Sequence, residues 1–80
     1  MRAQEAVVCR MIELIEGRGI TINKLANLSA IPSSTLKNIM NGKSNNTGIV
    51  TIAKICDGLE ITVQYFFSSP IFSNLEQEIQ

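Results

Sequence analysis

Short polar side chains and one lysine recur between residues 33 and 41, at a spacing that places them on one side of a helix. They are Ser33, Ser34, Lys37, Asn38 and Asn41. Hydroxyl and amide groups both donate and accept hydrogen bonds, and an asparagine can bond an adenine edge through both of its polar atoms. No acidic residue lies among them to repel a phosphate. A merely solvated face would gain helix stability from Ala, Glu or Lys, so the pattern favours base contact over a face without a partner. Contact with a protein is the third interpretation.

Little else in the chain could do chemistry. It has no histidine, and Cys9 and Cys56 are far apart and in no metal-binding spacing. No glycine-rich phosphate loop, no carboxylate pair in an apolar setting and no serine in a nucleophile elbow occurs. We therefore do not expect an enzyme, and we expect no metal, cofactor or small-molecule substrate.

The cellular location follows from the same sequence. No segment approaches the ~18–20 apolar residues that a membrane span requires. The first ten residues, MRAQEAVVCR, are too polar for a signal peptide. We therefore expect a cytoplasmic protein with reduced cysteines and no membrane partner.

The charges are distributed unevenly, although the formal net charge is +0. Between Glu16 and Asp57 the chain has five basic residues and no acidic one. These bases are Arg18, Lys24, Lys37, Lys43 and Lys54. From Asp57 onward every charged side chain is acidic. The basic middle favours a surface that meets a polyanion, although chance could also give this density.

Eighty residues make one domain, and apolar residues at helical spacing predict that it is all-α. The predicted helices cover about 4–16, 22–28, 32–41, 48–57 and 63–68. No segment shows the alternation of a strand. The tail, residues 70–80, is predicted as a possible sixth helix, because Ser73 and Glu76 have the spacing of a capping box.

Residues that end helices are expected at several boundaries. Threonines at positions 21 and 62 are predicted N-caps of the second and fifth helices, and Thr47 or Asn46 that of the fourth. Glycines predict the ends of the first helix (GRG, 17–19), the third (Gly42) and the fourth (Gly58). The buried stripe of the fourth helix is expected to hold Ile49, Ile52, Ala53, Ile55 and Cys56.

The second and third helices are separated by only Ala30, Ile31 and Pro32. Proline fits the start of a helix and not its interior, so the chain must turn here and begin the third helix at a steep angle. Two short helices joined in this way make a helix-turn-helix. Its second helix would keep Leu36 and Ile39 inside and direct its polar face outward.

Residues 21–67, TINKLANLSAIPSSTLKNIMNGKSNNTGIVTIAKICDGLEITVQYFF, resemble the phage repressor and Cro-type (XRE-like) helix-turn-helix family. The likeness rests on a small residue at Ala26, Ile31 in the turn, Leu36 and Ile39 inside the third helix, and the NGK sequence after it. It implies a five-helix, lambda-repressor-like domain over residues 1–69 that binds operator DNA as a homodimer. A bare domain of this size also resembles regulators of prophages.

The resemblance assigns roles by position. It implies that Ser33, Ser34 and Asn38 face bases, with Lys37 near a base or a phosphate. It implies that Thr21, Asn41 and Lys43 approach the DNA backbone. Two positions depart from the family: Ala30 stands where glycine is usual, and Ile22 stands where a phosphate-binding glutamine is frequent.

Three phenylalanines near the C-terminus are candidates for a dimer contact. They are Phe66, Phe67 and Phe72. Because the fifth helix is too short to bury all of them together with Tyr65, we expect at least one to contact a partner subunit.

The sequence therefore predicts a DNA-binding transcriptional regulator, most simply a repressor, that reads the major groove with the helix at about 32–41. The alternative is a protein-interaction module on the same fold, similar to an antitoxin or an anti-repressor. The neutral net charge and Ile22 favour that alternative.

Overall fold

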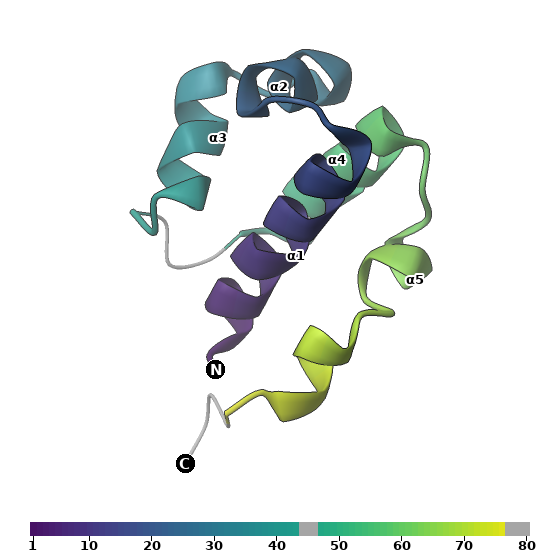
Figure 1. Ribbon diagram of the computed structural model, residues 1–80. Helices are drawn as coiled ribbons and strands as arrows, with labels where there is room; N and C mark the ends of the chain where they lie inside the picture. The colour runs from purple at the N-terminus through teal and green to yellow at the C-terminus, as the bar shows by residue number, and fades with distance from the viewer. Residues whose placement is uncertain (44–46, 77–80) are drawn as a thin grey trace.

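The computed structural model describes residues 1–43 and 47–76, and these form an all-α domain (Figure 1). Its elements are α1 (Ala3–Arg18), α2 (Ile22–Ser29), α3 (Ser33–Met40), α4 (Ile49–Leu59), α5 (Val63–Phe66) and the 3₁₀ helix η1 (Pro70–Asn74). The predicted class, five helices and no strand, is confirmed for this part of the chain. In Figure 1, α2 and α3 lie at the end of the molecule opposite to Met1.

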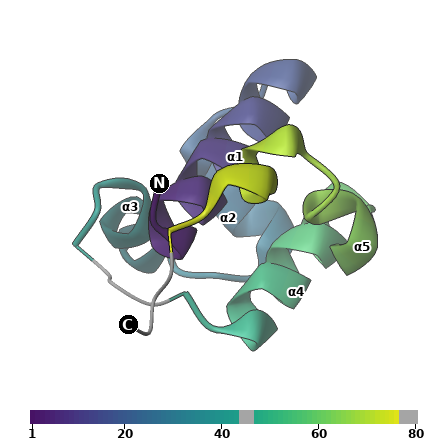
Figure 2. The same ribbon diagram turned by 90° about the horizontal axis from the view of Figure 1, so that it is seen from below.

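The core is aliphatic and draws on all five α-helices. Viewed from below, α3 lies on one side of α1, and α4 and α5 lie on the other (Figure 2). Among the described residues, the side chains with less than 2 % exposure are those of Phe66, Met11, Leu25, Leu36, Ile55, Leu59 and Cys56, together with Ala6 and Ala26. Burial of Cys56, followed by the nearby carboxylate of Asp57, raises the pKa of its thiol. None of the helices described is both long and apolar enough to cross a membrane.

The C-terminal end of α4 differs from the prediction. Gly58 does not end this helix, which continues to Leu59, and Glu60 takes the left-handed C-cap conformation with φ 58°. Gly58 has a packing role instead: a Cβ there would lie 2.5 Å from the Ser29 hydroxyl and 2.9 Å from the carbonyl of Leu28. The glycine therefore allows α2 and α4 to approach closely.

The N-terminal end of α4 also differs. Its N-cap is Gly48, without a side-chain cap, so the prediction of Thr47 as cap is wrong, and Asn46 lies outside the described residues. The Gln4 side chain bonds Thr47 twice instead, donating to its hydroxyl (2.7 Å) and accepting from its backbone N–H (2.8 Å). Ile49 is 62 % exposed rather than buried, because the first turn of α4 extends beyond the core.

Other helix ends follow the prediction more closely. Thr21 and Thr62 both accept a hydrogen bond from a backbone N–H three residues later, as N-caps do. Helix α1 is longer than predicted, since it runs through Gly17 to Arg18 before Gly19 takes the left-handed conformation. At the C-terminus, Ser73 lies inside η1 instead of opening a helix, and residues 77–80 of the predicted sixth helix lie outside the described residues.

Arg10 connects α1 to the end of α5. Its guanidinium donates to the carbonyls of Phe66 (2.7 Å) and Tyr65 (2.9 Å), and it pairs with Glu13 at 3.3 Å. Glu13 in turn accepts a hydrogen bond from the Ser69 hydroxyl, just before η1. The carbonyls at the end of this one-turn helix thus receive donors from a charged group on another helix.

The three phenylalanines form one cluster. Phe66 is fully buried and meets Phe67 edge to face at 5.0 Å between ring centroids, while the rings of Phe67 and Phe72 are 4.9 Å apart. Phe66 is therefore a core residue, which leaves Phe67 and Phe72 as the accessible members of the three candidates for a dimer contact. Phe67 is 38 % exposed and Phe72 packs partly buried against the core.

Candidate nucleic-acid interface

The turn between α2 and α3 is built around a left-handed alanine. Ala30 has φ 55° and ψ 39°, and its N–H and that of Ile31 bond back to carbonyls near the end of α2. Ile31 then turns inward and is 7 % exposed, while Pro32 sits at the N-cap position of α3. The turn thus keeps the shape that glycine usually adopts, at the steric cost of a β-carbon.

Replacing Ala30 with glycine should therefore stabilise the protein. Relief of the left-handed strain is worth about 1 kcal/mol, part of which the greater freedom of glycine in the unfolded chain cancels. Urea denaturation should show a net gain in the free energy of unfolding. The control Ala53→Gly, inside α4, should lower the free energy of unfolding by about 1 kcal/mol. A loss in both variants would contradict the assignment of strain to this turn.

Helix α3 separates its two faces as predicted. Leu36 is fully buried and Ile39 is 5 % exposed, and Met40 packs at the edge of the core. All five predicted polar residues of the outer face are exposed: Ser33, Ser34, Lys37, Asn38 and Asn41. Thr35, which the sequence analysis did not single out, is exposed as well.

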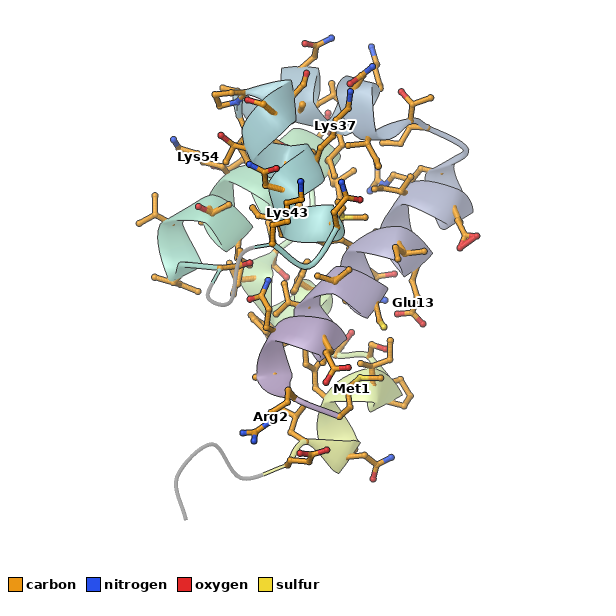
Figure 3. The ribbon with its side chains drawn as sticks, turned by 90° about the vertical axis from the view of Figure 1, so that its left-hand side faces the viewer. Met1, Arg2, Glu13, Lys37, Lys43 and Lys54 are labelled. Carbon is orange, nitrogen blue, oxygen red and sulfur yellow. The ribbon has the colours of Figure 1, made fainter. Side chains whose placement is uncertain are left out.

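Lys37 and Lys43 add positive charge to this outer face. Figure 3 shows Lys37 and Lys43 at the α3 end of the molecule and Met1 and Arg2 at the opposite end. Neither lysine forms an ion pair with any residue that the structure describes, and neither α2 nor α3 carries an acidic side chain. The outer face of α3 is therefore polar and positively charged, which suits a polyanion.

Beside α3 lies an open groove of about 430 Å³ that reaches the start of α4. Thr35, Asn38 and Lys43 line it on the α3 side, and Thr47 and Thr51 line it on the α4 side. Of these residues, only Asn38 and Lys43 are among the site residues predicted from the sequence. Thr47 and Thr51 could not be assigned from spacing, because they lie before and within α4, which only the fold brings beside α3.

The predicted backbone contacts surround the outer face. The Thr21 hydroxyl accepts a hydrogen bond from the N–H of Lys24 (3.1 Å), which leaves its own proton free to donate. Lys43 follows Gly42, whose φ of 75° ends α3, and the N–H of Lys43 bonds the carbonyl of Asn38 at 3.0 Å. Ile22 packs against the core at the start of α2, where the family often carries a phosphate-binding side chain.

Two short helices at a tight left-handed turn, the second of them presenting a polar and basic outer face, define a helix-turn-helix domain. The chain belongs to the family of Cro/C1-type HTH DNA-binding domains, whose model matches residues 10–67. It is also similar to a solved structure described as the crystal structure of the prophage Lp1 protein 11. That similarity has 34 % sequence identity and a TM-score of 0.80, over 94 % of this chain and 100 % of the other. None of the curated proteins compared with the chain matches it.

Proposed function

We propose that this protein is a sequence-specific transcriptional regulator, acting as a repressor, that inserts α3 into the major groove of double-stranded DNA. The observation that carries the proposal is the outer face of α3, which is wholly exposed, polar and free of acid, with two lysines that form no ion pair within the described part of the chain. The major groove is about 12 Å wide and accepts a helix. Membership in a DNA-binding family supports the same function.

The side chains divide between bases and backbone. Asn38 and the two serines at the start of α3 would bond base edges, and Lys37 would reach a base or a phosphate. Thr21, Asn41 and Lys43 would contact the backbone. The short serine side chains limit the number of direct contacts, so part of the specificity would come from the shape of the DNA.

Two copies of the protein would bind one operator. Each subunit offers few lysines, and Ile22 supplies no polar contact, so a single domain would bind weakly. A homodimer with both α3 helices in successive major grooves predicts a roughly palindromic operator whose half-sites lie about 34 Å apart.

The test is a fluorescence-anisotropy titration with a random pool of duplex DNA at two salt concentrations, followed by sequencing of the bound fraction. Enrichment of a two-fold symmetric motif with salt-dependent affinity is the expected result. If the folded protein bound no DNA at low salt, the proposal would fail, and the alternative of a protein-interaction module would gain support.

Two alanine variants should separate base contacts from backbone contacts. Asn38→Ala should weaken binding to the selected operator by about 1–3 kcal/mol while changing binding to random DNA little. Lys43→Ala should weaken binding to both alike and lower the slope of affinity against salt by about one unit per lost phosphate contact. Asn74→Ala, at the far end of the molecule, serves as the control. Equal losses on both DNAs for Asn38→Ala would refute its assignment to bases.

A further inference from the structure

The outer side of α4 carries one stripe of exposed side chains. Val50, Lys54 and Asp57 follow one another at intervals of four and three residues, which places them on one face of the helix. All three are exposed, and Ile61, four residues beyond Asp57, is half-buried just after the helix ends. The opposite face of α4, with Ile52, Ile55 and Cys56, belongs to the core.

Exposed apolar side chains lie at or beside both ends of this α4 stripe. At its start, Val50 is 67 % and Ile49 62 % exposed, and these are the most exposed large apolar side chains in the described part of the chain. At the other end, Leu28 is 46 % exposed, and its backbone lies against Gly58. The stripe thus begins with an exposed apolar residue and is charged beyond it, and the exposed apolar side chains of Ile49 and of Leu28 on α2 lie next to its two ends.

The order of the charges makes the α4 stripe complementary to itself. If a second α4 lies antiparallel to the first, with the two-fold axis between residues 55 and 56, Lys54 faces Asp57 of the partner subunit. Val50 then lies beside the C-terminal end of α4 of the partner subunit. A two-fold interface uses the same patch on both subunits and therefore needs this self-complementarity. Lys54 and Asp57 are available for such pairs, since neither forms an ion pair with a residue that the structure describes.

We propose that a second copy of this chain covers the α4 stripe, in an antiparallel pairing held by two Lys54–Asp57 ion pairs with apolar contacts on either side. This proposal names the surface through which the proposed homodimer would form. The α4 pairing does not require DNA, and only its effect on operator binding rests on the proposed function. In Figure 3 Lys54 projects sideways, away from the face that carries Lys37 and Lys43. The outer face of α3 can therefore remain open in the dimer.

Charge reversal tests the pairing by sedimentation velocity of the whole chain, without DNA, over a range of concentrations. Lys54→Glu should weaken self-association about tenfold or more, because each glutamate would face an aspartate of the partner subunit. The double variant K54E/D57K exchanges the two charges and should restore association. Val50→Ser should weaken it, while Lys24→Glu, the same charge change on α2, should leave it unchanged. Circular dichroism of each variant shows that it remains folded.

Three outcomes would overturn the inference. They are a wild-type protein that stays monomeric, a Lys54→Glu variant that associates like the wild type, and a double variant that does not recover. If Phe67→Ser dissociates the dimer and Lys54→Glu does not, the second copy binds through α5 instead. Anisotropy on operator DNA keeps the two proposals apart. A dimer that binds no DNA refutes the proposed DNA binding and leaves the α4 pairing intact. A monomer that binds one half-site refutes the α4 pairing and the dimeric operator, and leaves DNA binding by α3 intact.

Discussion

Replacing Gly58 with alanine is expected to lower the free energy of unfolding by about 3 kcal/mol. The new β-carbon would lie 2.5 Å from the Ser29 hydroxyl and 2.9 Å from the backbone of Leu28, and the backbone cannot give way without moving α2 from α4. Helix propensity acts in the opposite direction, since alanine inside a helix is favoured over glycine by about 1 kcal/mol. The expected loss therefore means that packing outweighs propensity at this position.

Gly17→Ala is the matched control. Gly17 also lies inside a helix, but a β-carbon there would meet nothing within 4 Å, so the variant should be stabilised by up to about 1 kcal/mol. Denaturation in urea would measure both. The Ser29 hydroxyl is buried and has no hydrogen-bond partner among the residues that the structure describes. Ser29→Ala should therefore lower stability little and should partly rescue Gly58→Ala. Similar gains for Gly58→Ala and Gly17→Ala would show that the close approach of α2 and α4 is not required.

Replacing Arg10 with methionine is also expected to lower the free energy of unfolding by about 3 kcal/mol. Methionine keeps most of the apolar stem, but it removes two charge-assisted hydrogen bonds to the carbonyls of Tyr65 and Phe66. It also removes the cation–π contact with the Tyr65 ring, at 5.3 Å, and the partner of Glu13. The Arg10 side chain is only 11 % exposed, so water replaces these donors poorly.

Arg18→Met provides the comparison, because Arg18 lies exposed in the last turn of the same helix. Arg18→Met should lower the free energy of unfolding by no more than about 0.5 kcal/mol. Arg10→Lys should recover only part of the loss, since an ammonium cannot bond two carbonyls in the fixed geometry of a guanidinium. If Arg10→Met unfolded at the same urea concentration as Arg18→Met, Arg10 would not hold α5 in place.

The sequence was sufficient for features that depend on local spacing. The five helices, the caps at Thr21 and Thr62, and the division of α3 into a buried and a polar face all follow from residues within one or two turns of each other. The break between α2 and α3 was predictable in the same way, because Pro32 does not fit inside a helix.

Features that depend on distant contacts could not be predicted. Gly58 was expected to end α4, and only the position of Ser29 on another helix explains why it is glycine. Thr47 was expected to cap α4, and only the fold brings Gln4 to it from 43 residues away. Arg10 is a third example, because its contacts with α5 come from a helix more than fifty residues away and cannot be read from α1 alone.

The junction of the two ends of the described chain has a consequence for the order of folding. The Met1 ammonium and the Arg2 guanidinium both pair with Glu76, and the N–H of Glu76 bonds the carbonyl of Met1 at 2.9 Å. Closing a loop of this length in an unfolded chain costs about 4 kcal/mol of entropy, whereas exposed ion pairs return at most about 1 kcal/mol each. The junction can therefore form only after the helices have brought the ends together. We therefore expect the contacts of Glu76 with Met1 and Arg2 to form last during folding and to open first in the native protein, while α2, α3 and α4 stay assembled.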